Sequence, residues 1–417
     1  MSDPLRVAVI GGSGASSPEL IDAIADWPGG SDRRPRLEVV LQGRSAEKLA
    51  LVADACRARL PEAVTGVRIS TETDVASALE GAGVVLIQVR IGGLDARVFD
   101  ETFPRTFGIP GEETMGPGGF ANALRTVPAL ASLWDDLTAH ASGAFIINLT
   151  NPSGIVSQAA TAHTGLRIVS VCDGPVTFVN DIAKAIGRDA SSVRMGYAGL
   201  NHAGVWVDPD LSVTLSALSA ARGADADDVR RLGVLPSPYL RYYLHPDAQL
   251  AAQLASPDSR AQELKRLEGE MLGQYASGVG AREHKRRGAL WYRVSIVPLI
   301  DAVLHGGTDT IVLGLPNGSA VDWAPPDATV ELPTDVATGG RLARRRAVGL
   351  PGPVADLLRR HAAFEASTAR ALAGSRSRED VRARRTSLVE ALVLNPMVPS
   401  VDVAERITDE IVASSPT

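Results

Sequence analysis

The chain has 417 residues, of which 45% are hydrophobic and 22% are charged, which is typical of a globular protein with two domains or one large one. Its formal net charge of −6 argues against a nucleic-acid-binding surface, which would need a basic stripe, but is compatible with a locally basic pocket for an anionic small molecule. No stretch reaches the roughly 18 uninterrupted apolar residues that predict a membrane span.

The two cysteines, Cys56 and Cys172, are too few for a disulfide framework. The first residues, MSDPLRVAVIGG, lack the basic start and cleavage site of a signal peptide. We therefore expect a cytoplasmic protein, in whose reducing surroundings a free thiolate can serve as a metal ligand or a nucleophile.

The first 90 residues alternate between strands and helices. Strands are predicted at 5–10, 37–41 and 84–89, helices at 18–27 and 45–60, and further strands at 144–149 and 166–172. Such alternation predicts a doubly wound parallel sheet with a Rossmann-like α/β fold. We assign residues 1–190 to this nucleotide-binding domain.

The pattern changes after residue 190, so we predict a second, α+β domain over 191–417. It begins with β-like pieces, continues with a charge-rich helical stretch at 256–303 and two strands at 311–313 and 329–332, and ends with two helices. Apolar helices such as 296–303 and the C-terminal one are candidates for a homodimer or homotetramer interface. The active site is expected between the domains, at the carboxyl ends of the strands.

A glycine-rich turn follows the first predicted strand. Gly11, Gly12, Ser13 and Gly14 come directly after the apolar run, although Ser17 stands where the full fingerprint has a third glycine. Glycines let the backbone approach a pyrophosphate, and the following helix N-terminus supplies amide donors. The turn predicts nucleotide binding; a structural strand–helix turn is the alternative.

The second predicted strand ends without the acidic residue that usually holds the adenosine ribose. Gln42 can still hydrogen-bond a ribose hydroxyl, and Arg44 can pair with a 2′-phosphate. Both NAD and NADP therefore stay open, and an exposed loop charge is an equally good interpretation of Arg44.

Three further groups of residues carry possible chemistry. Cys172 and His202 suit a borderline divalent metal, although their spacing alone favours a buried thiol and a core histidine. Asp173 and Tyr239 can act as acid and base, although tyrosines spaced like Tyr239, Tyr242 and Tyr243 are more often packing residues. The cluster of Lys285, Arg286, Arg287 and Arg293 beside aromatic residues suits an anionic sugar, although composition alone favours a solvated helix face.

The chain resembles glycoside hydrolase family 4, the NAD- and manganese-dependent glycosidases, from about residue 5 to residue 412. The matching stretches occur in order along the chain: GGSGASSPEL, QVRIGG, RVFDE, GEETMGPGG, ALRTVP, NLTNPSG, VCDGP, GLNHAGVW, PSPYLRYYL, SRAQEL, KRRGALWY, PNGSAV and ALVLNPMVPS. So many ordered matches are far more specific than one glycine turn.

The resemblance implies a mechanism that differs from the two-carboxylate scheme of most glycosidases. NAD would oxidise the sugar C3 hydroxyl, a base would remove the acidified C2 proton, and the glycosidic oxygen would leave by elimination. Water would then add and the stored hydride would restore C3. A divalent metal, Mn²⁺ or another, would hold the C2 and C3 oxygens.

By position, the resemblance makes Cys172 and His202 the metal ligands and Tyr239 the C2 base, and it matches Asp173 to the general acid of the α-cleaving members. It also assigns Arg97, Asn151 and Arg260 to substrate contacts, and Arg287 belongs to the anion-binding cluster. Tyr242 and Tyr243 are then packing residues.

The chain departs from the family pattern at several positions. Glu112 stands where glutamine is common, which puts an extra charge near the metal, and Gln42 replaces the usual acid of the second strand. Asp173 is typical of α-cleaving members, whereas LEVVLQGRSAEKLALV, KRRGALWY and ALVLNPMV resemble the 6-phospho-β-glucosidases. Arg293 stands where the latter usually have serine.

We therefore predict a glycosidase for anionic sugars, with 6-phospho-β-glucosides the leading substrates. Sulfonated, α-linked or unphosphorylated glycosides are alternatives within the same mechanism. An NAD(P)-dependent sugar dehydrogenase and a non-catalytic nucleotide sensor are alternatives of another class, because a fold does not fix a function.

Overall fold

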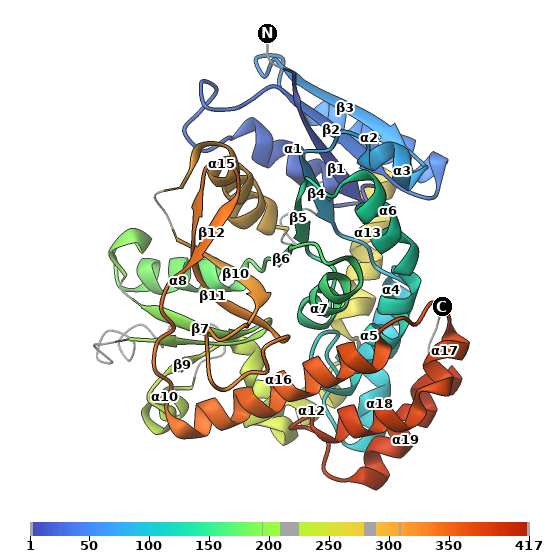
Figure 1. The fold of residues 1–417 in the computed structure, drawn as a ribbon, viewed down its shortest axis with the longest axis vertical. Helices are drawn as coiled ribbons and strands as arrows, with labels where there is room; N and C mark the ends of the chain where they lie inside the picture. Colours follow the sequence, from blue (N-terminus) through green and yellow to red (C-terminus); the bar gives the residue numbers. More distant parts are fainter. Residues whose placement is uncertain (1–2, 194, 209–224, 279–288, 308–309, 415–417) are drawn as a thin grey trace.

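The computed structural model describes residues 3–193, 195–208, 225–278, 289–307 and 310–414, and its centre is one mixed sheet (Figure 1). The strand order is β3-β2-β1-β4-β5-β6-β10-β11-β7-β8-β9, and β12 pairs with β11. The strands are β1 (Leu5–Ile10), β2 (Leu37–Gln42), β3 (Val67–Glu72), β4 (Val84–Ile87), β5 (Phe145–Asn148), β6 (Ile168–Ser170), β7 (Gly196–Leu200), β8 (Ala203–Val207), β9 (Leu235–Pro236), β10 (Ile311–Pro316), β11 (Thr329–Ala337) and β12 (Arg341–Arg344).

The first six strands of this order are parallel and form the Rossmann-like part predicted from the sequence. Successive residues of β1 face opposite sides. Val7 and Val9 pack with helices α1 (Ser17–Ala25), α2 (Ala46–Arg59) and α15 (Val297–His305), and Ala8 and Ile10 pack with α5 (Gly116–Ala129), α6 (Ala131–His140) and α7 (Ser153–Thr164). Both faces are covered, which is why the inner strands β1, β2, β4 and β5 are mainly apolar.

The antiparallel strands extend the same sheet instead of forming a separate one. β10 pairs with β6 through Gly314 and Ser170, β11 pairs with β10, and β7 pairs with β11. The strands expected at 311–313 and 329–332 are thus present and longer than predicted. The division at residue 190 stays a prediction.

The structure differs from the sequence-based expectations at several places. β3 was not predicted, because Val67–Glu72 mixes polar and apolar residues. The helical stretch expected at 256–303 contains α13 (Arg260–Ala276) and α15, and α15 buries Leu299 and Ile300 inside the monomer. The apolar residues that suggested an oligomer interface at 296–303 therefore pack inside the monomer, and the homodimer or homotetramer stays a prediction without an assigned interface.

The C-terminal region has four helices within the described residues instead of the two expected. They are α16 (Gly352–Leu372), α17 (Arg378–Ala383), α18 (Arg385–Val393) and α19 (Val401–Ser414), drawn in orange-red and red in Figure 1. α16 lies against α7 and α18, so the end of the chain covers one face of the sheet.

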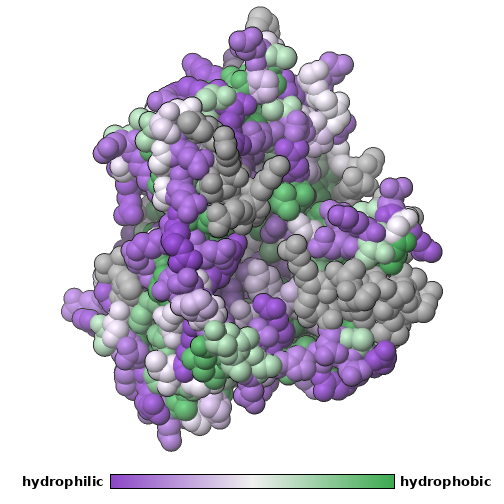
Figure 2. All heavy atoms as spheres, turned by 180° about the vertical axis from the view of Figure 1, so that it is seen from behind, coloured by the Kyte–Doolittle hydropathy of each residue, from purple (hydrophilic) through white to green (hydrophobic). Residues whose placement is uncertain are grey.

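The molecular surface is mainly polar on the face shown in Figure 2, where hydrophobic residues occur in scattered groups. The large hydrophobic residues that are exposed include Leu254, Leu290 and Val401. No helix in the described part of the chain combines the length and apolar character of a membrane span.

Candidate active site

The glycine turn between β1 and α1 is shaped by close backbone approaches. Gly11 has φ +88°, and a Cβ on Gly12 would lie 2.8 Å from the Cα of Leu41. The Gln88 side chain, at the end of β4, donates to the Gly11 carbonyl at 3.4 Å and to Ser17 Oγ at 3.3 Å. The turn is therefore a rigid cradle at the N-terminus of α1, and it fits the pyrophosphate of a dinucleotide.

The end of β2 lies beside this turn. The Gly12 amide donates to the Gln42 carbonyl at 2.7 Å. The Gln42 side chain is buried, and its Nε2 donates to the Thr73 carbonyl at 3.1 Å, which leaves its oxygen for a ribose hydroxyl. Arg44 is exposed in the loop before α2. The structure thus brings Gln42 to the turn and leaves Arg44 in solvent at its edge.

The hairpin between β7 and β8 carries His202 at its tip. Leu200 pairs with Ala203, so Asn201 and His202 form a two-residue turn in which His202 has φ +64°. This left-handed conformation is uncommon for a residue other than glycine and requires support from its surroundings. Ser237 Oγ donates to the His202 carbonyl at 2.5 Å.

A buried carboxylate on β11 fixes the same hairpin. Glu331 accepts hydrogen bonds from Asn201 Nδ2 at 3.1 Å and from the Tyr197 hydroxyl at 2.8 Å. Burial raises the pKa of Glu331, and the two hydrogen bonds lower it again without cancelling that effect. The turn that presents His202 is thus held from the neighbouring strand.

Four of the predicted site residues come together where β6 ends. Cys172 and Asp173 follow β6, and the Gly174 amide donates to Cys172 Sγ at 3.4 Å. Burial raises the pKa of the Cys172 thiol, whereas its contact with His202 lowers it. The Tyr239 ring stacks on the His202 ring with centroids 3.9 Å apart and an interplanar angle of 9°. Burial also raises the pKa of Asp173, at the start of α8 (Gly174–Ala185).

The Cys172–His202 pair fits a divalent metal of borderline softness. His202 Nδ1 is buried and has no hydrogen-bond partner, and the carboxylate of Glu112 lies 3.8 Å from it. Within the described residues there is no group of three or more His, Cys, Asp and Glu side chains placed to hold a metal. A Cys–His pair of this kind would leave other positions on a bound ion for a substrate, as catalytic metal sites do.

Arg97 belongs to a buried charge network beside these residues. It pairs with Glu113 at 2.8 Å, and its Nε donates to Glu101 at 2.7 Å. Arg90, after β4, also pairs with Glu113. Burial raises the pKa of Glu113, but the two guanidinium groups lower it further, to about 2. Both arginines are therefore oriented by carboxylates before any substrate arrives.

The remaining predicted substrate residues are placed less directly. Asn151 follows β5 at the same edge of the sheet. Arg260 begins α13 and pairs with Glu263 in solvent, although the next amide, of Ala261, donates to Glu101 at 2.8 Å. Arg287 lies outside the described residues, as do Lys285 and Arg286 of the same cluster. Arg293 forms an ion pair with Asp26 at the surface, so its charge is directed away from the site.

Sequence reasoning missed three residues of this arrangement: Arg90, Glu113 and Glu331. Glu331 had a usable signal, because an acidic residue in the middle of the apolar strand TVELP needs buried donors. Arg90 and Glu113 had none beyond their place in the matching stretches, since their pairing joins segments far apart in the chain.

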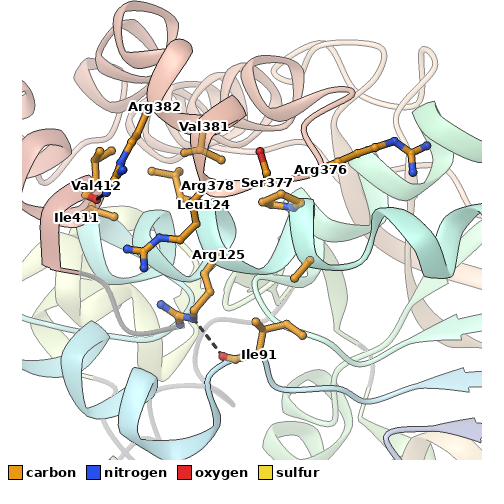
Figure 3. Close-up of a pocket in the computed structure, with 12 residues that line it drawn as sticks. Ile91, Leu124, Arg125, Arg376, Ser377, Arg378, Val381, Arg382, Ile411 and Val412 are labelled. Carbon is orange, nitrogen blue, oxygen red and sulfur yellow. Dashed lines mark hydrogen bonds between the residues drawn. The ribbon is translucent and has the colours of Figure 1, made fainter. Parts of the chain in front are cut away.

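A separate cavity of about 260 Å³ lies between α5, α17 and α19 (Figure 3). Its lining includes four arginines: Arg125, Arg376, Arg378 and Arg382. Arg125 pairs with Asp100, and Arg376 pairs with Asp135, pointing away from the cavity in Figure 3. Arg382 donates to the Val412 carbonyl at 3.4 Å. These side chains support the C-terminal helices, and we assign no ligand to the cavity.

Comparisons with known proteins identify the family and agree with the overall fold. Residues 6–188 match the family 4 glycosyl hydrolase model, and residues 197–398 match the C-terminal domain of that family. A probable 6-phospho-beta-glucosidase of Bacillus subtilis is 29% identical over 439 residues, covering 99% of this chain and 96% of its own. A 6-phospho-alpha-glucosidase of Lacticaseibacillus paracasei is 28% identical, covering 98% and 97%. The structure of the Thermotoga maritima 6-phospho-beta glucosidase with manganese, NAD⁺ and glucose-6-phosphate superposes with a TM-score of 0.84 at 25% identity, covering 98% and 97%.

Proposed function

Because the chain belongs to glycosyl hydrolase family 4 and is a glycosidase, we propose that it cleaves 6-phospho-glucosides with the help of NAD and a divalent metal such as Mn²⁺. The observation that carries the proposal is the meeting of Cys172, Asp173, His202 and Tyr239 where β6 ends. The relatives that act on phosphorylated glucosides support the substrate class, and β-linked substrates are our first choice.

The residues of this chain have separate tasks in the proposed reaction. Cys172 and His202 hold the metal, Tyr239 removes the proton from sugar C2, and Asp173 donates a proton to the leaving oxygen. When bound, NAD and the metal would supply reversible oxidation at C3 and a charge that acidifies the C2 proton. Gly11, Gly12, Ser13, Gly14 and Gln42 bind the dinucleotide in this proposal, and Arg97, Asn151 and Arg260 bind the sugar.

The proposed enzyme needs Cys172 as a thiolate, which supports the expected cytoplasmic location because oxidation would destroy the ligand. The small-molecule glycoside is its partner in this proposal. A homodimer or homotetramer remains our expectation, with no interface assigned.

The deciding experiment is release of p-nitrophenol from α- and β-glucosides that carry a 6-phosphate, a 6-sulfonate or a free C6 hydroxyl. We expect turnover of the 6-phospho-β-glucoside that requires both NAD and Mn²⁺ under reducing conditions, without net NADH. Steady NADH formation from a free sugar, with no release of p-nitrophenol, would show a sugar dehydrogenase instead.

The base is tested by exchange of the C2 hydrogen with deuterated solvent, with Tyr239→Phe compared against Tyr242→Phe. We expect Tyr239→Phe to slow exchange and turnover by about 10²–10⁴-fold, the usual contribution of a general base. Tyr242, three residues away and facing Gln253, is the matched control and should change both rates little. Equal effects of the two substitutions would remove Tyr239 from its role.

A further inference from the structure

We propose that Glu112 is the residue that positions His202 for metal binding, by accepting the proton of Nδ1 and leaving Nε2 as the ligand atom. The inference rests on the proposed function, because it concerns how this chain prepares its metal site. The two oxygens of Glu112 face different partners.

One oxygen of Glu112 is fixed by the backbone. Its Oε2 accepts hydrogen bonds from the amides of Thr114 and Met115, both at 2.7 Å, and the side chain is 8% exposed. A buried carboxylate with one oxygen held by two amides has little rotational freedom. The direction of its other oxygen is therefore set by the GEET turn and not by the ligand.

The other oxygen of Glu112 faces the histidine. Oε1 lies 3.8 Å from His202 Nδ1, which is buried and has no hydrogen-bond partner. The distance exceeds that of a hydrogen bond, so the bond forms when the His202 ring turns slightly toward the fixed carboxylate. A buried nitrogen without a hydrogen-bond partner destabilises the fold, so a carboxylate acceptor at this place stabilises it.

The His202 ring is restrained by its other neighbours as well. Tyr239 stacks on its face, and the thiol of Cys172 contacts it. With Nδ1 directed at Glu112, the neutral tautomer that places hydrogen on Nδ1 is favoured, and Nε2 keeps its lone pair. Carboxylate–histidine–metal arrangements of this type fix the tautomer and raise the basicity of the ligand nitrogen.

The test uses the full-length apoprotein titrated with Mn²⁺ alone, without substrate. Glu112→Ala should weaken the Mn²⁺ Kd by about 10–100-fold, the usual effect of losing such a partner. The Mn²⁺ Kd of Glu112→Gln should lie between those of the wild type and Glu112→Ala, because one amide oxygen cannot accept from both the two backbone amides and His202. Glu410→Ala, an exposed glutamate of α19, is the control and should leave the Kd unchanged.

A second measurement separates positioning from a general loss of structure. Side-chain ¹⁵N spectra of the Zn²⁺-loaded protein should show His202 protonated on Nδ1, and Glu112→Ala should show a mixture of tautomers with NAD affinity retained. An unchanged Kd in Glu112→Ala, or hydrogen on Nε2 in the wild type, overturns the inference alone. Failure of the wild-type protein to bind Mn²⁺ overturns the proposed function instead.

Discussion

The glycine turn between β1 and α1 and the β7–β8 hairpin that carries His202 hold their functional groups in place in different ways. The turn from Gly11 to Gly14 is made of backbone from one short segment, and its shape follows from the absence of side chains. The hairpin presents His202 in a conformation that side chains from other segments must maintain, among them Glu331 and Ser237. A site made of backbone depends on the absence of side chains, whereas a site made of side chains depends on contacts with other segments of the chain.

This difference predicts which substitutions affect one half of the site and spare the other. A change in the turn should weaken NAD binding and leave the metal in place. A change around His202 should do the reverse. Three predictions test this separation, from the largest expected effect to the smallest, and a fourth concerns a carboxylate outside both halves.

Removal of a metal ligand should give the largest loss. Cys172→Ser should lower kcat/KM with Mn²⁺ on the order of a thousandfold, since the metal supplies several kcal/mol of transition-state stabilisation. The NAD Kd, measured by fluorescence titration, should change less than about threefold, which is below 1 kcal/mol. Cys56→Ala, in the buried face of α2, is the control and should keep its activity. A large change in NAD affinity for Cys172→Ser would show that the two halves are coupled.

A side chain at position 12 should disrupt the glycine turn and weaken NAD binding. The Cβ of Gly12→Val would meet Leu41 at 2.8 Å, and relief of the clash requires a backbone shift that costs about 1–3 kcal/mol. The NAD Kd should therefore rise by about 10–100-fold, with Mn²⁺ affinity unchanged in the same titration series. Gly143→Ala, where nothing lies within 4 Å of the added carbon, is the matched control. Normal NAD binding by Gly12→Val would refute the cradle.

The buried carboxylate of Glu331 tests the support of the hairpin. Glu331→Gln places an amide group against one of two donors, Asn201 or Tyr197, and should lower the free energy of unfolding by about 1–3 kcal/mol. Mn²⁺ affinity should fall with it, because Asn201 precedes His202. Tyr197→Phe removes one donor without creating a clash and should cost about 1 kcal/mol with metal binding intact. A larger loss of stability in Tyr197→Phe than in Glu331→Gln, measured by urea unfolding, would contradict this account.

The smallest effect concerns pH and a carboxylate that belongs to neither half. Asp301, on α15, accepts hydrogen bonds from Trp27 Nε1 at 2.8 Å and Arg33 Nε at 2.9 Å. Burial raises the pKa of Asp301, but these donors and His305 lower it below its ordinary value. A carboxylate with a lowered folded-state pKa stabilises the protein above its unfolded pKa, about 3.9, and this contribution is lost as pH falls through the folded value.

The wild type should therefore exceed Asp301→Asn in stability by up to about 1 kcal/mol at pH 7, because the Arg33 partner is largely exposed. The difference should shrink as pH falls below about 4 in thermal unfolding curves. A difference that stays constant from pH 7 to pH 3 would show that hydrogen-bond geometry, and not charge, matters at this position. Activity should be equal in both proteins at pH 7.

The sequence predicted local features well and long-range ones poorly, for a physical reason. The β1 strand and the glycine turn were predicted because an apolar run and missing side chains are visible in a dozen residues. Strand β3 was missed because it lies at the edge of the sheet and is only partly buried. The pairing of Cys172 with His202 was expected only from the family resemblance, since spacing alone favoured separate buried residues.

Other contacts between distant segments were not predicted. Arg90 and Glu113 meet because a strand end and a loop face each other across the sheet edge. The fold class, the glycosidase class and the family were nevertheless correct, because ordered short matches carry information that periodicity lacks. The roles of the individual site residues remain predictions for the experiments above.

The position of β10 and β11 in the sheet has a consequence for synthesis of the chain on the ribosome. These strands, at residues 311–337, lie between β6 and β7, which come more than a hundred residues earlier. Until they emerge, β6 and β7 each have an edge with unpaired backbone groups, which invites association with other chains. A nascent chain that stops before residue 311 therefore cannot close its sheet, and the His202 hairpin lacks the strand that carries Glu331. Formation of the catalytic centre is thereby postponed until most of the protein has been made.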